Sequence, residues 1–167
     1  MNAAALTTAI AEILTGSIGA TRTVPAGTYL EGVHDGSNEA QMNQRSLVKP
    51  RFAIRLENPK RSGAVGPSTA DRVIIEMGVK ITFTYLAPQE ILTAGRREIE
   101  ATAIDNAETA RRALEWPGNL TQTSAATATG LISGCLVYDA GRQARVNWRQ
   151  RIYQRELSFT ARVLDTQ

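Results

Sequence analysis

The sequence of 167 residues contains very few of the side chains from which metal centres and disulfides are built. Cys135 is the single cysteine and His34 the single histidine, which excludes an internal disulfide and leaves zinc without a ligand set. Cys135 lies in the apolar run GLISGCLVYDA, which predicts a buried small side chain. No run of about 18 apolar residues occurs, so we expect no membrane-spanning helix.

Signatures of catalysis are equally scarce. His34 lies beside Asp35 in the loop-like segment EGVHDGSNE, and the chain has no GxSxG elbow. The segment GAVGPST contains glycines but lacks the GK[ST] ending of a phosphate-binding loop. The sequence therefore predicts no enzyme, no cofactor and no metal, and an enzyme with an unrecognised site stays open as an alternative.

Charge is distributed unevenly along the chain. The formal net charge is only +3, and the 43% apolar and 21% charged residues are typical of a folded globular protein. From Ala140 to Arg155, however, the chain has five arginines and no acid. These arginines are Arg142, Arg145, Arg149, Arg151 and Arg155. Such a cluster can meet phosphates or an acidic protein surface, or can be a solvated strand end.

Three segments alternate between apolar and polar residues, as half-buried strands do. The longest is RVIIEMGVKITFTYL at 72–86, and the other two span 51–57 and 151–164. The apolar side of 151–164 includes Tyr153, which we therefore expect to be buried. Glu76 falls on the polar side of 72–86, where Arg55 is its expected cross-strand partner. A fourth strand, LISGCLVYD at 131–139, is apolar on both sides and is expected near the centre of a sheet.

Helical periodicity marks two further segments. Residues 3–15 repeat apolar side chains at spacings of three and four, and 89–116 carries an apolar stripe that ends at WPG. On the polar side of the longer helix, Glu108 and Arg112 are spaced for an ion pair. A brief helix is expected at 38–45.

The remaining segments are expected to be turns and loops. Turns and a short strand are expected in residues 16–37, long flexible loops at 58–71 and 117–130, and a basic turn in AGRQARVNWRQ at 140–150. The order of elements is therefore helix, hairpin, long helix, hairpin. It predicts an α+β fold in one domain, residues 1–167: a four-stranded antiparallel sheet of two hairpins, with the long helix packed across one face and an N-terminal helix.

This order, with RFAIRLE followed by RVIIEMGVKITFTYLAP, a long helix, and a closing hairpin ending in YQRELSFTARVLD, resembles the tail terminator (tail-completion) proteins of long-tailed bacteriophages. Related head–tail joining proteins share the same general fold. The resemblance covers roughly residues 1–165 and depends on element order and hairpin style, whereas the glycine-rich stretch 16–37 with His34 matches nothing distinctive in the family.

The resemblance implies a virion protein of the phage neck, assembled in the host cytoplasm. Six copies would form a ring that caps the tail tube, ends its polymerisation and joins it to the head connector. Implied partners are further copies of the chain, the tail-tube protein and the head-completion protein, with no membrane, and DNA passes through the ring without specific binding. We expect the interface cations to be Lys60, Arg61, Arg72, Arg142, Arg145 and Arg149.

A nucleic-acid-binding α+β domain is the principal alternative. In this interpretation the basic 142–155 segment would contact nucleic acid, with Trp148 and Tyr153 available for base stacking. No RNP-like KGFGFV segment is present, and the expected burial of Tyr153 weighs against stacking. The salt dependence of DNA affinity would discriminate between the two functions.

Overall fold

The computed structural model of the protein describes residues 3–15, 28–29, 51–64, 72–86, 93–132, 134–149 and 152–166. The helix expected at 38–45, His34 and Arg151 lie outside these residues. The helices are α1 (Ala3–Thr15), α2 (Thr93–Glu115), α3 (Pro117–Leu120) and α4 (Ala126–Thr129). The strands are β1 (Thr28–Tyr29), β2 (Arg51–Ala64), β3 (Arg72–Leu86), β4 (Val137–Asn147) and β5 (Ile152–Thr166).

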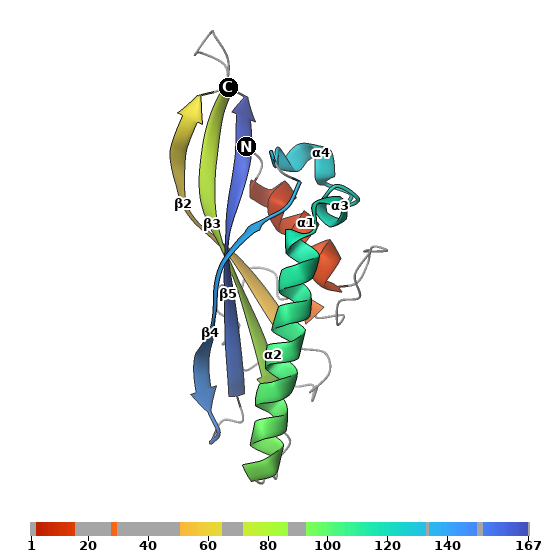
Figure 1. Cartoon of the computed structure of the whole chain (residues 1–167), viewed down its shortest axis with the longest axis vertical. Helices are drawn as coiled ribbons and strands as arrows, with labels where there is room; N and C mark the ends of the chain where they lie inside the picture. Colours follow the sequence, from red (N-terminus) through yellow and green to blue (C-terminus); the bar gives the residue numbers. More distant parts are fainter. Residues whose placement is uncertain are drawn as a thin grey trace.

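The predicted α+β fold is confirmed: two antiparallel hairpins form a four-stranded sheet, with the helices on one side of it (Figure 1). The strand order is β1-β2-β3-β5-β4, in which β1 adds two residues parallel to the start of β2. The central pair, β3 and β5, stays in register from Arg72↔Thr166 to Leu86↔Ile152. At a rise of about 3.3 Å per residue, this pair makes the sheet about 45 Å long.

The alternating pattern of the central strands produces the core. Most residues of β3 and β5 that face the helices are almost fully buried, whereas Ile75 and Arg155 on the same face are half-buried. The buried residues are Val73, Met77, Val79, Ile81, Phe83, Tyr85, Tyr153, Leu157, Phe159, Ala161 and Val163. The buried position predicted for Tyr153 is therefore confirmed. Near the end of the sheet formed by the start of β2, the opposite face is buried as well, and there the amide of Gln154 donates a hydrogen bond to Thr84 Oγ1 (3.1 Å).

Two helices cover the inner face of this sheet. The predicted apolar stripe of α2 is buried at Ile99, Ala103, Ala107, Ala110 and Leu114. Helix α1 buries seven of its residues, six of them in the same core, and also packs on α3 and α4. No helix in the described ranges is long and apolar enough to span a membrane.

The loop predicted at 58–71 is wrong for its first part, because β2 continues to Ala64. Asn58 has a φ of 44°, and the pairing of β2 with β3 shifts between Glu57 and Lys60 and again between Arg61 and Gly63. Pro59 is tolerated because this stretch of β2 is an edge strand in the described sheet. β2 therefore continues, with bulges, through a segment whose composition is typical of a loop.

The loop predicted at 117–130 is wrong for residues 117–120 and 126–129, which form α3 and α4, while residues 121–125 between them are turns. Pro117 occupies the first position of α3, where a missing N–H has no cost. The Asn119 amide donates to the carbonyl of Ala113 (2.9 Å), which joins α3 to the end of α2. The Ser124 N–H donates to Glu12 (2.8 Å), so this segment is also attached to α1.

The third wrong prediction concerns 131–150. The described residues of 131–136 form one isolated bridge, Leu131↔Val163, and in the described sheet β4 begins at Val137 as an edge strand and not a central one. Most of the expected basic turn is in fact β4, which runs to Asn147. Bulges between Tyr138 and Ala140 and between Gln143 and Arg145 break the alternation that would have revealed this strand. Cys135 is half-buried, not buried.

Candidate interaction surfaces

The six cations predicted to form interfaces fall into two groups at opposite ends of the sheet. Lys60 and Arg61 lie near the end of β2, and Arg72 begins β3 beside them. Arg142 and Arg145 lie on β4, and Arg149 follows in the turn before β5. Figure 1 shows the end of β2 at one extreme of the long axis and the end of β4 toward the other. The structure therefore places the six cations, which the sequence analysis treated as one set, on two separate surfaces.

The first group, which we call the hairpin tip, consists of Lys60, Arg61 and Arg72. The side chains of Lys60 and Arg61 are exposed, while that of Arg72 lies outside the described part. Lys60 lines a shallow pocket of about 260 Å³ together with Glu57, Asn58, Glu76, Met77, Gly78 and Thr160. The tip therefore presents cations around a shallow, polar depression.

The ion pairs beside this depression differ from the prediction. Glu76 pairs with Arg162 (3.1 Å) and not with Arg55, because the strand pairing sets Arg162 opposite Glu76 and sets Arg55 opposite Lys80. Arg55 instead pairs with Glu57 (3.1 Å). The carboxylate of Glu57 also binds the ammonium of Lys80 (2.8 Å), and this hydrogen bond lowers the pKa of Glu57 below its usual value.

The second group lies on the edge strand β4. The bulge at Ala144 matches Arg145 with Gln154 and Arg142 with Glu156, so both arginines share one face of the sheet despite a spacing of three residues. Arg142 pairs with the carboxylate of Glu156 (2.9 Å). The side chains of Arg145 and Arg149 are exposed.

At the start of α2, Arg96 lies beside the turn that carries Trp148 and Arg149, which the sequence did not indicate. The Arg96 guanidinium lies over the ring of Trp148, 5.3 Å from its centroid, and Trp148 stacks on Tyr153 with centroids 6.2 Å apart. Arg97 follows on the exposed side of the same turn of α2. Arg145, which the strand pairing sets opposite Gln154, lies on the sheet face that points away from α2. Trp148 was a possible clue, but nothing in the sequence pairs it with residue 96.

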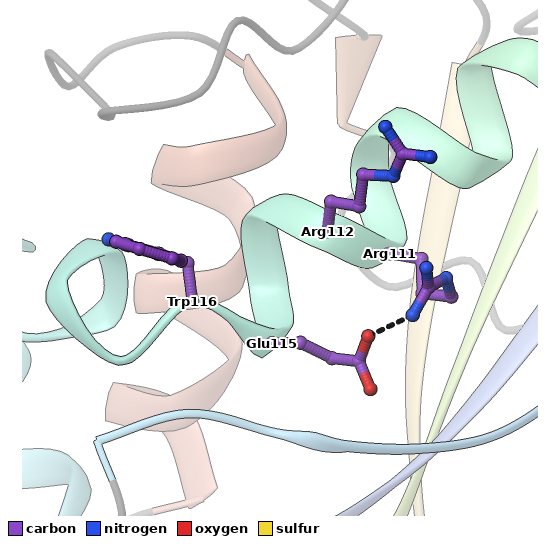
Figure 2. A pocket seen from close by; sticks show the side chains of 4 residues that line it. All are labelled: Arg111, Arg112, Glu115 and Trp116. Carbon is purple, nitrogen blue, oxygen red and sulfur yellow. Dashed lines mark hydrogen bonds and ion pairs between the residues drawn. The ribbon is translucent and has the colours of Figure 1, made fainter.

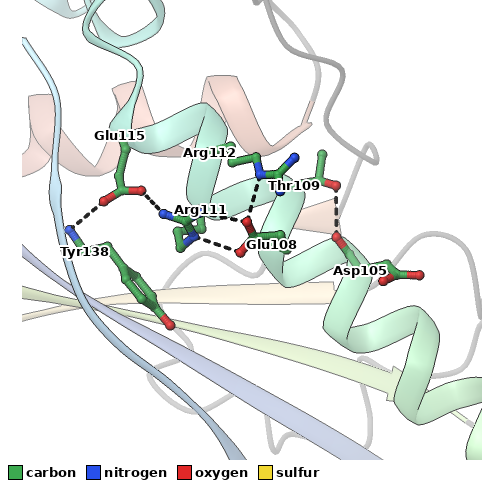
Figure 3. A network of polar contacts seen from close by, with 7 residues as sticks. All are labelled: Asp105, Glu108, Thr109, Arg111, Arg112, Glu115 and Tyr138. Carbon is green, nitrogen blue, oxygen red and sulfur yellow. Dashed lines mark hydrogen bonds and ion pairs between the residues drawn. The ribbon is translucent and has the colours of Figure 1, made fainter.

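The end of α2 carries a network of charged side chains that reaches β4 (Figure 3). Arg111 donates two hydrogen bonds to the Glu108 carboxylate (2.8 and 2.7 Å) and also pairs with Glu115. The predicted pair between Glu108 and Arg112 is confirmed, with a separation of 2.8 Å. Hydrogen bonds from Arg111, and then from Arg112, lower the pKa of Glu108 from 4.5 to about 2.

Contacts with Tyr138 extend this network to the sheet. The Tyr138 N–H donates to Glu115 (3.3 Å), and the Arg111 guanidinium lies 5.3 Å from the centroid of the Tyr138 ring. Tyr138 in turn packs edge-on against Phe159, with centroids 5.6 Å apart. The network therefore joins α2 to the edge strand and, through Phe159, to the core.

A second shallow pocket of about 410 Å³ lies at the same end of α2, lined by Arg111, Arg112, Glu115 and Trp116 (Figure 2). The Trp116 side chain is 44% exposed, and Val137 at the start of β4 is 48% exposed. Arg111 and Arg112 are both neutralised by glutamates, so the pocket has no unbalanced charge. Exposed tryptophan beside arginine is a composition typical of protein–protein contacts.

Comparison with models of known protein families finds no match to this chain, and comparison with curated proteins finds none either. Within the described residues, no cluster of three or more histidine, cysteine, aspartate or glutamate side chains could hold a metal ion. Function is therefore inferred from the fold and from these surfaces.

Proposed function

We propose that the protein is a structural component of a phage neck, in which six copies form a ring that caps the tail tube, ends its polymerisation and joins it to the head connector. The observation that carries the proposal is the placement of two exposed cationic surfaces at opposite ends of one long sheet. A joining subunit has to meet a different partner on each side, and each surface can bind an acidic one. The role requires no catalytic residue and no cofactor.

The order of elements supports the same role. Helix, hairpin, long helix and hairpin is the order on which the resemblance to tail terminators depends, and the described elements keep it. The central strands run about 45 Å, well beyond a typical strand of about 17–20 Å. Strands of this length allow a single domain to contact one partner at each end without a second domain.

Contacts between copies would use the two sides of the sheet. Within the described residues, β4 has no neighbour on its outer side, and β2 has none after Phe52. If the β4 side of one copy packs against the β2 side of the next copy, the contact is heterologous. Repeated copies then close into a ring when the rotation between neighbours permits it. Bulges and charges on both edges limit continuous strand pairing, so side chains such as Trp116 and Val137 would supply much of this contact.

Inactivating the gene in the phage or prophage that encodes it tests the proposal. Without a terminator the tube continues to polymerise, so electron microscopy should show tails of abnormal and variable length without heads. Supplying the wild-type chain should restore tails of uniform length joined to heads. Tails of normal length that carry heads, formed in the absence of the protein, would refute the proposal.

Charge reversal at the hairpin tip tests the interface more narrowly. The variant K60E/R61E should fail to restore joined particles, whereas the charge-conserving control K60R/R61K should restore them. Both residues are exposed, so both variants should fold, and circular dichroism checks this. Full complementation by K60E/R61E would show that the hairpin tip is not part of the interface.

A further inference from the structure

The surfaces of α2 and β5 that pack together each contain one polar residue among apolar ones. On β5, the alternation that buries Tyr153 and Leu157 places Arg155 between them, on the face that packs against the helices. On α2, Asn106 lies next to the buried Ala107. The side chains of Arg155 and Asn106 are both half-buried. Polar groups at such positions normally have hydrogen-bond partners.

Tyr85 on β3 lies close to both of these residues. The strand pairing sets Tyr85 opposite Tyr153 and Phe83 opposite Arg155, so Tyr85 and Arg155 are diagonal neighbours on the face that carries the core. Burial raises the pKa of Tyr85 to about 12, while Asn106 and Arg155 act to lower it, as a donor and a cation near the hydroxyl do. Tyr85 itself is 0% exposed. The three polar groups therefore converge between α2 and the central strands.

Each of these three side chains has a buried polar atom without a hydrogen-bond partner. The atoms are the Tyr85 hydroxyl oxygen, Asn106 Nδ2 and Arg155 Nε. The two nitrogen atoms can only donate, and the hydroxyl can donate as well. Within the described residues, Arg155 also forms no ion pair. The cluster therefore presents several donors and a positive charge, both of which an anion would satisfy.

We propose that Tyr85, Asn106 and Arg155 bind a small inorganic anion of the chloride type between α2 and the sheet. An anion can accept from all three donors and also balances the guanidinium charge, which a water molecule does not. A small free ion suits the site because Tyr85 and its edge-on neighbour Tyr153 are almost fully buried. The proposal concerns the folded subunit and depends neither on the ring nor on the cationic surfaces at the ends of the sheet.

Thermal unfolding of the purified chain, followed by circular dichroism, tests the proposal. Melts are compared in sodium chloride and in sodium gluconate at the same ionic strength, because gluconate is too large for such a site. An anion that binds only the folded state stabilises it by mass action. Above the dissociation constant, a tenfold rise in chloride should lower the unfolding equilibrium constant about tenfold and raise Tm by about 3–6 °C.

Two variants assign this effect to the cluster. R155Q removes the charge and should abolish the difference between chloride and gluconate. Y85F removes one donor but keeps the ring, and should weaken chloride binding about tenfold or more. The matched control R162Q removes the same charge from the opposite face of the same strand and should keep the full chloride effect.

Y85F keeps the site testable if R155Q does not fold. Equal melting of the wild-type chain in the two salts would overturn the proposal. A chloride effect that R155Q and Y85F leave intact, or that R162Q abolishes, would do so as well. Tail length reports on the ring separately, so either proposal can fail alone.

Discussion

Replacing Arg111 with methionine should weaken the join between α2 and β4. The methionine keeps most of the stem but removes the ion pairs with Glu108 and Glu115 and the contact with the Tyr138 ring. The Arg111 side chain is 27% exposed and its partners 41% and 32%, so each pair contributes about 0.5 kcal/mol after solvent screening. The ring contact adds about 0.5–1 kcal/mol, for a total loss of about 1.5–2 kcal/mol.

Urea unfolding followed by circular dichroism at pH 7 measures this loss, with R112M as the matched control. Arg112 is 57% exposed and pairs only with Glu108, so R112M should lose no more than about 0.5 kcal/mol. For a domain of this size, the R111M loss corresponds to a fall in Tm of roughly 3–8 °C.

The pH dependence gives a second readout. The pKa of Glu108 is lowered from 4.5 to about 2 in the folded protein, so its pairing stabilises the fold fully above pH 4.5. This stability is lost as the pH falls toward 2, when the folded protein also takes up the proton. The difference between wild type and R111M should therefore shrink over that range by the contribution of the Glu108 pair. Equal losses in R111M and R112M at pH 7, or a difference that stays constant down to pH 2, would refute the reasoning.

Three further substitutions test the packing. Gly130→Ala should lose about 2 kcal/mol or more, because Gly130 has a φ of 66° and a Cβ there would lie 2.9 Å from the Leu164 carbonyl; Gly63→Ala, in open space, should lose little in the same thermal melts. Phe159→Ala should lose about 3–5 kcal/mol in urea unfolding, since Phe159 is only 1% exposed; a loss below about 1 kcal/mol would contradict its place in the core. Burial raises the pKa of Tyr85 to about 12, so stability should fall as pH rises from 10 toward 12, and Tyr85→Phe should reduce that fall; an identical alkaline profile would show that Tyr85 does not cause it.

The parts of the fold that the sequence predicts correctly are those in which one local period continues without interruption. Apolar residues alternate through 72–86, and β3 has those bounds. Residues 3–15 match α1, and the stripe from Ile99 to Leu114 is the buried side of α2. In these segments the core face is a direct consequence of the spacing, so no tertiary information is needed.

The incorrect predictions share a different cause. β2 beyond Glu57 and β4 after Tyr138 both contain bulges, each of which moves the following residues to the other face of the strand. A segment such as GRQAR then has no period of two and looks like a turn. The apolar run before Val137 has the composition of a strand, but its described residues form one isolated bridge. Its Leu136 N–H donates to the carbonyl of Leu114 at the end of α2 (3.1 Å).

The interaction surfaces were only partly predictable for a related reason. The sequence identifies cations at 60–61 and 142–149, but the distance between them follows from the strand pairing. Arg96 lies near Arg149 because its guanidinium contacts the ring of Trp148, which is 52 residues further along the chain. A single sequence gives no signal for such a long-range contact.

The position of β5 in the sheet has a consequence for the order of folding. β5 is the last of these strands along the chain, yet it pairs with both β3 and β4 and therefore holds the two hairpins together. Until β5 has been translated, β4 lacks its partner and the apolar face of β3 lacks its neighbour. The helices can form before β5 is translated, whereas the four-stranded sheet cannot be completed until then. Many of its pairings join residues that are distant in the sequence, and folds of this kind form slowly.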